Sequence, residues 1–354
     1  MKIRVLVAAL TALSITACSG ADEPAAATTS VISAERCAQN KAAGKITYLS
    51  GYQWQASASI LEYVAAKKLG YFESHCLDVT MQPGTGDTSQ NTKLLASGQV
   101  TFSPVSQQDV LSANANGIKV TGVSAYSNVG LEVLMTKTDV TDLKQLDGTT
   151  LGQKGAMPIG VRAMLAQAGA NYDSIKQVVV GYDPSILPRG QVRSLTGFIS
   201  NEPNQLKKAN TPVKVWRPYD YQVPGSLGAM AVNPEFAAKH PSAVQDFLRA
   251  GLHAFEYCER NGAECVKAAA DLTGAGYDEE HNLAIWQTEV GVVRETLKAG
   301  TPLGTIDPAN VESLVKLLDT YGGTSIAGTD TSAAFDPSFV TAIHSGATLV
   351  WPAA

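Results

Sequence analysis

The sequence predicts an α/β protein with two lobes and a helical C-terminal part. From Lys45 onward, short β-branched runs alternate with helical stretches, a rhythm typical of mixed, mostly parallel sheets covered on both faces. A second unit begins near "VTDLKQLDG", and "LGAMAVN" reads as a strand that returns to the first unit. The remainder has helical periodicity, as in "EEHNLAIWQTEVGVVRETLKAG". We therefore expect a discontinuous first lobe, 45–137 and 225–354, and a second lobe at 138–224.

The N-terminus has the pattern of an export signal. Lys2 and Arg4 precede the apolar run "VLVAALTALSI", which is too short to span a bilayer as a helix. The run ends in "ITAC", which resembles the lipobox of bacterial lipoproteins, whose cysteine is acylated. We expect a lipoprotein signal peptide at 1–17, lipidation of Cys18 and a tether with an N-terminal segment at 18–44. The protein would then be anchored at the extracytoplasmic face of a bacterial cell membrane; a plain secretory peptide with a chance cysteine is the alternative.

The remaining cysteines indicate disulfides. An even number of cysteines in an exported protein favours bridges, and four cysteines allow three pairings. Two of them flank "ERNGAE", a helix–turn–helix pattern, so a local bridge between Cys258 and Cys265 is one possibility, and Cys37 would then pair with Cys76. No C-x-x-C motif or histidine cluster accompanies them, so we expect no metal site.

Composition and motifs exclude several classes of function. The net charge of −5 over 354 residues provides no basic face, so nucleic acid is not an expected partner. The sequence has no G-x-S-x-G, H-E-x-x-H or G-x-x-x-x-G-K motif, so we assign no catalytic residue and no cofactor and expect a protein that is not an enzyme. The segment "GTGDTS" lacks the third glycine of a dinucleotide fingerprint and reads as a turn with Asp87 as a helix N-cap.

Ligands of open α/β sheets bind near the carboxyl ends of the strands. The segments "SPVSQQ" and "SAYSNVG" follow predicted strands, which makes Ser106, Gln107, Tyr126 and Asn128 candidate contacts. Ser106 is also a predicted N-cap, and the second segment could be a simple crossover turn. Met157 lies at the start of a predicted helix of the second lobe. Its side chain could form an apolar wall for a ligand, or it could simply pack at the start of the helix.

Several motifs, in order, resemble the family of ABC-transporter substrate-binding proteins for nitrate, sulfonates, taurine and thiamine-pyrimidine precursors. These motifs are "YVAAKKLGYFESHCLDVTMQPGTGDTSQNTKLLASGQVTF" and "DLKQLDGTTLG", and the likeness runs from about residue 45 to 234. The resemblance implies a type II periplasmic-binding-protein fold that closes on a small ligand. It also implies a monomer whose partner is an ABC permease.

The segment "GFISNEPNQLKKANTPVKVWRPYDYQVPG" resembles the branch that binds thiamine-pyrimidine precursors. This resemblance makes Asn201, Glu202 and Tyr221 candidate ligand contacts. It does the same for Gln53, Trp54 and Ser59 of the loop "YQWQASAS", where Ser59 replaces the branch's histidine. Two alternatives stay open: Trp54 could be a structural lid, and Glu202 could serve the N-terminus of the following helix.

The ligand expected from these residues is small and flat, a pyrimidine precursor, flavin or related heteroaromatic compound. The first rival is a binder of sulfonate, nitrate or a similar anion, for which Arg162, Arg189 and Arg193 are available. The second rival is a pyrimidine-forming enzyme. The export signal and the lack of the cysteine-rich cluster of those enzymes argue against the second rival.

Overall fold

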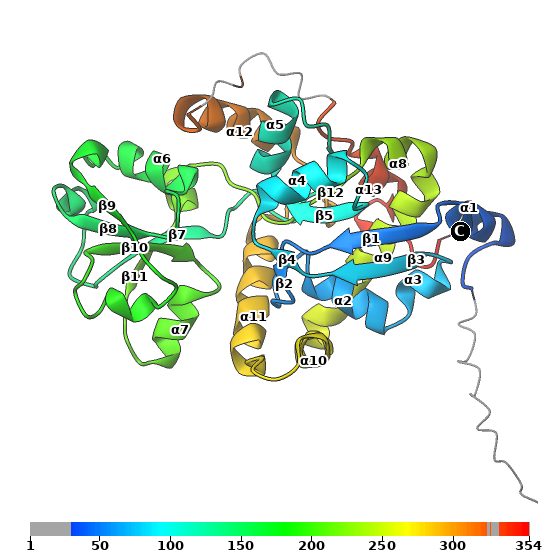
Figure 1. Ribbon diagram of the computed structural model, residues 1–354, viewed down its shortest axis with the longest axis horizontal. Helices are drawn as coiled ribbons and strands as arrows, with labels where there is room; N and C mark the ends of the chain where they lie inside the picture. The colour runs from blue at the N-terminus through cyan, green and yellow to red at the C-terminus, as the bar shows by residue number, and fades with distance from the viewer. Residues whose placement is uncertain (1–29, 324–325, 327–332, 354) are drawn as a thin grey trace, which may run out of the picture.

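The computed structural model describes residues 30–323, 326 and 333–353. The predicted signal peptide and Cys18 lie outside this range. Within it, no helix combines the length and apolar character needed to cross a bilayer. Two five-stranded sheets, each covered by helices, form two lobes that lie side by side (Figure 1). The predicted two-lobe α/β architecture is confirmed.

Lobe one is built on a sheet with the strand order β3-β1-β5-β12-β6. Strand β12 runs against its two neighbours, and the other four strands are parallel. The predicted return strand is therefore present, and it inserts between β5 and β6. Its strands are β1 (Lys45–Leu49), β3 (Asp78–Gln82), β5 (Phe102–Val105), β6 (Thr121–Ser124) and β12 (Ala229–Val232).

A two-stranded ladder extends lobe one beyond the ends of β1 and β3. It pairs β2 (Tyr52–Gln53) with β4 (Gly84–Thr85). Gly84 approaches the end of β1 so closely that a Cβ there would lie 1.9 Å from the carbonyl oxygen of Ser50. Only glycine allows this approach, which fixes the ladder against the sheet.

The helices of lobe one begin at residues suited to capping. The predicted N-caps Asp87 and Ser106 accept hydrogen bonds from the first turns of α4 and α5, and Ser106 forms a capping box with Asp109. The helices before β6 are α1 (Ala34–Ala42), α2 (Leu61–Lys68), α3 (Tyr71–Ser74), α4 (Thr88–Ala96) and α5 (Gln107–Ala115).

Lobe two is built on a sheet with the order β11-β7-β10-β8-β9, in which β7 alone runs against the others. Its strands are β7 (Glu132–Thr136), β8 (Thr150–Gln153), β9 (Lys176–Val179), β10 (Ser194–Phe198) and β11 (Lys214–Trp216). Its helices are α6 (Ile159–Gln167) and α7 (Glu202–Lys208), with 3-10 turns η1 (Leu143–Leu146), η2 (Tyr172–Ser174), η3 (Pro184–Ile186) and η4 (Pro218–Tyr221).

One boundary differs from the prediction. Residues up to 137 were expected in lobe one, yet β7 pairs with β10 and β11 in the second sheet. The first crossover between lobes therefore lies in residues 125–131, and the second joins η4 to β12. Five consecutive β-prone residues, "EVLMT", could belong to either sheet on sequence grounds, because only the pairing partners decide.

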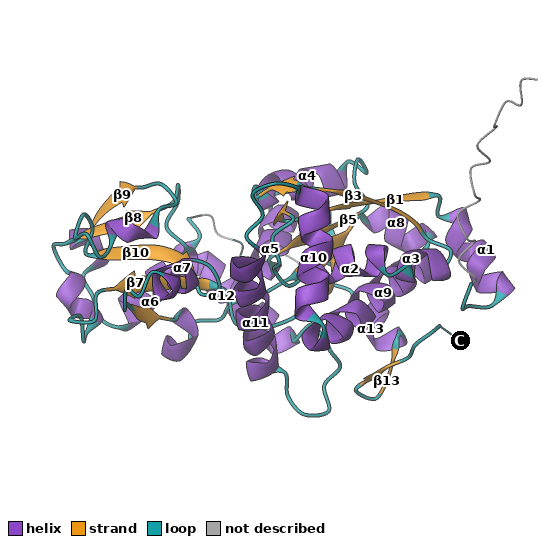
Figure 2. Cartoon of the chain, turned by 90° about the horizontal axis from the view of Figure 1, so that it is seen from below, coloured by secondary structure: helices purple, strands orange, loops and turns teal. Residues whose placement is uncertain are grey.

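The C-terminal part is largely helical, as predicted, and returns to lobe one. Figure 2 shows α11 between the second lobe and helix α10. The elements are α8 (Pro234–Lys239), α9 (Pro241–Arg260), α10 (Gly262–Thr273), α11 (Glu279–Thr296), α12 (Pro308–Tyr321), α13 (Ser338–Ala342), β13 (His344–Ser345) and β14 (Thr348–Leu349).

The core divides along the faces of the sheets. One cluster packs one face of the first sheet against α2, α9 and α10. A second cluster packs the opposite face against α5 and α12 and continues into lobe two, where Leu134 belongs to it. Val133 and Met135, its neighbours on β7, point the other way and pack with Leu206 of α7. This alternation is the period of two that a strand buried on both faces requires.

Two disulfides join Cys37 to Cys76 and Cys258 to Cys265. This is the pairing favoured by the local pattern around "ERNGAE". The first bridge ties α1 to the segment between α3 and β3, and the second closes the turn between α9 and α10.

Candidate functional site

The carboxyl edges of the two sheets face each other across the crossovers. Phe198, the last residue of β10, pairs with Glu132, the first residue of β7, so β10 ends where the chain arrives from lobe one. The N–H of Ile199 donates to the carbonyl of Leu131 at 2.7 Å. Strands β8 and β9 run parallel to β10, so their carboxyl ends also turn toward lobe one (Figure 1). This is the place where open α/β sheets bind ligands.

The edge of lobe two carries a buried charge pair. Lys154 follows β8, and its ammonium group forms an ion pair with the carboxylate of Glu202 at the start of α7; these side chains are 13% and 0% exposed. Glu202 Oε2 accepts a hydrogen bond from the N–H of Phe198 at 2.8 Å. Gly197 leaves room for this carboxylate, since a Cβ there would lie 2.6 Å from Oε2. Glu202 was expected to face a ligand, but it is enclosed, and Lys154 is the member of the pair nearer the surface.

Aromatic rings are exposed at these edges, and a further ring of lobe two, Tyr219 of η4, is 41% exposed. Tyr52 in strand β2 of lobe one is 48% exposed, and Phe198 in lobe two is 47% exposed. Tyr182, which follows β9, is 77% exposed, and Lys154 Nζ lies 5.5 Å from the centre of its ring. Large aromatic side chains are usually mostly buried, and exposed rings at facing edges can stack on a flat partner.

The loop that contains Trp54 turns mostly inward. Trp54 is 9% exposed, packs in the core of lobe one and accepts a hydrogen bond on its carbonyl from Tyr277 Oη at 3.0 Å. Ser59 is buried at φ 75°, where its N–H donates to Glu62 Oε1 at 2.7 Å. Trp54 therefore packs as the structural lid of the alternative interpretation, and Ser59 fixes the backbone of the loop through its N–H. Gln53 alone of these three candidates is exposed.

The candidates after β5 and β6 stabilise the edge from within. Tyr126 is buried, and its hydroxyl donates to Glu62 Oε1 at 2.6 Å. Ser106 caps α5, and Gln107 is fully buried, with its N–H donating to Ser226 Oγ at 2.9 Å. Burial raises the pKa of Glu62 to about 8, an effect that the hydrogen bond from Tyr126 opposes.

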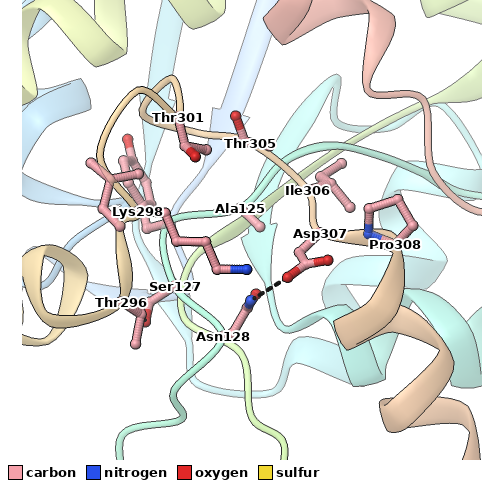
Figure 3. A pocket seen from close by; sticks show the side chains of 12 residues that line it. Ala125, Ser127, Asn128, Thr296, Lys298, Thr301, Thr305, Ile306, Asp307 and Pro308 are labelled. Atoms are coloured by element: carbon pink, nitrogen blue, oxygen red, sulfur yellow. Dashed lines mark hydrogen bonds between the residues drawn. The ribbon is translucent and has the colours of Figure 1, made fainter. Parts of the chain in front are cut away.

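Asn128 lies at a pocket of about 230 Å³ beside the first crossover. The pocket is lined by residues 125–128 and by the connection from α11 to α12, including Lys298 and Asp307 (Figure 3). Asn128 Nδ2 donates to Asp307 Oδ2 at 3.1 Å, and Figure 3 shows the Lys298 side chain extending toward this hydrogen bond. Asn128 thus links the crossover to the C-terminal helices.

The other lobe-two candidates are half-buried. Met157 and Tyr221 pack against the core cluster that continues between the lobes. Asn201 Oδ1 accepts from Gln205 Nε2 at 2.9 Å and lies 2.8 Å from Nε2 of His281 on α11. Asn201 therefore connects lobe two to α11 rather than standing free.

The sequence-based reasoning missed Tyr52, Lys154 and Phe198. Lys154 directly follows β8, Phe198 is the last residue of β10, and Tyr52 stands three residues after the end of β1. The rule that selected Tyr126 applies equally to these positions, so the signal was present. Across the described part of the chain, no group of three or more His, Cys, Asp or Glu side chains is arranged to hold a metal ion.

Sequence comparison finds one matching family model and a similar synthase. The family model described as "NMT1/THI5 like" matches residues 57–264. The 4-amino-5-hydroxymethyl-2-methylpyrimidine phosphate synthase of Schizosaccharomyces pombe is 26% identical over 224 residues, which are 58% of this chain and 63% of the synthase. The chain thus matches less than two thirds of that relative's length.

Solved structures share the fold at low sequence identity. A putative periplasmic sulfonate-binding protein, SsuA, from Methylobacillus flagellatus superimposes with a TM-score of 0.64 at 16% identity, covering 84% of this chain and 93% of that one. The Candida albicans CA3427 gene product, described as having the generic periplasmic binding protein fold, gives 0.56 at 15% identity, with 83% and 95% covered. The predicted periplasmic-binding-protein fold is confirmed. Since the family model spans more than half of the sequence, the chain belongs to the NMT1/THI5-like family.

Proposed function

We propose that this protein is the substrate-binding component of an ABC importer and binds a small molecule between its lobes. The fold and the family both fit this class of protein. Each lobe contributes contacts, so the ligand stabilises the arrangement in which both lobes hold it, and an ABC permease recognises that arrangement. In this proposal the chain is a monomer, exported and held at the outer face of the cell membrane by the lipid on Cys18.

The proposed ligand is a flat heteroaromatic compound, such as a pyrimidine precursor or a flavin. The observation that carries this proposal is the set of exposed rings on facing edges, Tyr52 in lobe one and Phe198 and Tyr182 in lobe two. Such rings can sandwich a planar ligand, and stacking adds about 0.5–1.5 kcal/mol beyond the buried area. The pyrimidine in the name of the Schizosaccharomyces pombe relative points to the same class of compound.

The charge at the site favours a neutral or weakly polar ligand over an anion. Lys154 is already paired with Glu202, so a sulfonate arriving there would meet a cation whose charge is offset. The arginines named for the anion alternative are engaged elsewhere. Arg189 pairs with Asp183 and Arg193 with Asp139, while Arg162 donates to the carbonyl of Tyr321.

Two alternative functions are each supported by one specific observation. Sulfonate binding is suggested by the fold neighbour SsuA, whose name states that specificity. A pyrimidine-forming activity is suggested by the synthase relative. If the purified protein converts any substrate to product, the enzymatic alternative would replace the binding proposal.

Calorimetric titration with a matched panel tests the proposal. The panel contains 4-amino-5-hydroxymethyl-2-methylpyrimidine and riboflavin on one side, and taurine and an alkyl sulfonate on the other. We expect one of the heterocycles to bind and to raise the melting temperature by mass action. Binding of taurine or the sulfonate, with no response to either heterocycle, would reverse the ligand assignment.

A further inference from the structure

Helix α11 carries a buried carboxylate that contacts both lobes. Glu289 is 1% exposed, and the same helix anchors in the core of lobe one through Trp286 and Val293. Within the described residues, no ion pair involves Glu289. A buried carboxylate without a cationic partner depends on hydrogen-bond donors for its stability.

The donors to Glu289 come from two separate loops. In lobe one, Ser57 Oγ and the N–H of Ala58 donate to Oε2 at 2.6 and 2.8 Å. In lobe two, Ser200 Oγ donates to Oε1 at 2.7 Å. The two carboxylate oxygens are therefore divided between the lobes.

Both loops continue directly from the exposed rings. Ser57 and Ala58 follow Tyr52 in the same loop, and Ser200 stands two residues after Phe198. The start of α7 keeps Ser200 beside α11, because Asn204 Nδ2 donates to Thr288 Oγ1 at 3.1 Å. Each exposed ring is therefore joined by a short stretch of backbone to a residue that donates to Glu289.

We propose that Glu289 is a positioning residue that fixes the two ligand-contact loops relative to each other through its bond with Ser200. This inference rests on the proposed ligand site between the lobes. When the lobes separate, Glu289 loses the Ser200 donor while it keeps the two donors of lobe one. The bond therefore favours the arrangement in which both edges face the ligand, and it lowers the cost of organising the site.

The chain offers a matched pair of serine variants. Ser200→Ala removes the donor from lobe two. Ser194→Ala changes another buried serine of the same lobe, at the start of β10, whose hydroxyl has no hydrogen-bond partner. Glu289→Gln is a conservative rescue: its amide oxygen can accept from Ala58, and its NH2 can donate to the Ser200 hydroxyl.

Hydrogen exchange of the segment around Ser200, which loses its contact with Glu289 in Ser200→Ala, gives a readout that needs no ligand. We expect Ser200→Ala to speed this exchange by about tenfold, which is the effect of losing one charge-assisted hydrogen bond across the lobe boundary. We expect Ser194→Ala and Glu289→Gln to stay within about twofold of the wild type. Equal exchange in Ser200→Ala and Ser194→Ala would show that Glu289 has only a local role in lobe one.

Titration with 4-amino-5-hydroxymethyl-2-methylpyrimidine and riboflavin provides the second arm. With whichever probe binds the wild type, Ser200→Ala should weaken binding by about tenfold and Ser194→Ala by less than about twofold. Unchanged binding in Ser200→Ala would overturn the inference while leaving the proposed function intact. If neither probe binds the wild type, the ligand class is wrong, and the exchange arm still decides the role of Glu289.

Discussion

Lys154 and Glu202 form an ion pair at the carboxyl edge of the second sheet, where the carboxylate is fully enclosed and the ammonium group is nearer the surface. The pair sets the charge that a ligand meets at this edge. Removing the carboxylate should therefore shift the preference of this edge toward anionic ligands.

Glu202→Gln should turn the edge into a cationic site. Burial lowers the pKa of Lys154 to about 8, and loss of the carboxylate lowers it further, so the uncompensated ammonium attracts anions well below that pH. Under those conditions we expect affinity for an alkyl sulfonate to rise by about tenfold. Calorimetric titration measures the change. Asp139→Asn is the matched control, because Asp139 also pairs with a cation in lobe two, Arg193, but at the opposite edge of the sheet. Equal sulfonate affinity in both variants would show that Lys154 does not face the ligand.

Tyr52→Ala and Phe198→Ala should each weaken binding of a heteroaromatic ligand. Loss of one stacked ring costs about 0.5–1.5 kcal/mol beyond its buried area, so affinity falls by about threefold to tenfold or more. Leu272→Ala serves as the control, since Leu272 is an equally exposed apolar side chain, 52% exposed on α10, and does not belong to the strand ends that carry the rings. If the two ring variants behave like Leu272→Ala, the rings are not the stacking surface.

The sequence was sufficient for the architecture because the signals for it are local. Alternating runs set the strands, and Asp87 and Ser106 cap the helices where predicted. The local sequence does not determine which sheet contains β7, because its residues suit either sheet. Its antiparallel pairing with β10 and β11 places it in lobe two.

Side-chain direction explains most of the errors at the site. Strand-end reasoning pointed to the carboxyl edges of the two sheets, but it could not tell which side chains turn inward. Trp54 turns into the core, where Tyr277 holds its carbonyl. Glu202 is enclosed because Lys154, from a different strand, supplies its counter-charge. Both outcomes depend on residues far away in the sequence, and a local pattern does not contain that information.

The two disulfides should contribute unequally to stability. In the chain-entropy model the contribution grows with the length of the closed loop, and the bridges Cys37–Cys76 and Cys258–Cys265 span separations of 39 and 7 residues. We expect Cys37→Ser with Cys76→Ser to lower the free energy of unfolding by about 4 kcal/mol, and the corresponding double variant of the other bridge by about 2 kcal/mol. Urea unfolding of both variants gives the comparison, and a larger loss for the short bridge would contradict the model.

The buried carboxyls Glu62 and Glu289 should make the fold less stable as the pH rises above neutrality. Burial raises the pKa of Glu62 to about 8 and that of Glu289 to about 7, from an ordinary value of 4.5. A carboxyl whose pKa is raised by folding stabilises the folded state fully below its unfolded pKa, and this contribution is lost as the pH rises through the folded value. The free energy of unfolding should therefore fall by about 1–3 kcal/mol between pH 6.5 and 8.5.

The histidines do not contribute to the window above pH 6.5, and Lys154, whose pKa burial lowers to about 8, opposes the decline near the upper end of that window. Burial lowers the pKa of His75, His253, His281 and His344 below 6.5, so these groups act on stability at lower pH. Glu62→Gln is the decisive variant: Ser59 and Tyr126 both donate to Oε1, which the amide oxygen can replace. Urea unfolding across this window should show a shallower decline for Glu62→Gln than for the wild type. An unchanged slope would mean that Glu62 is already ionised in the folded protein at neutral pH.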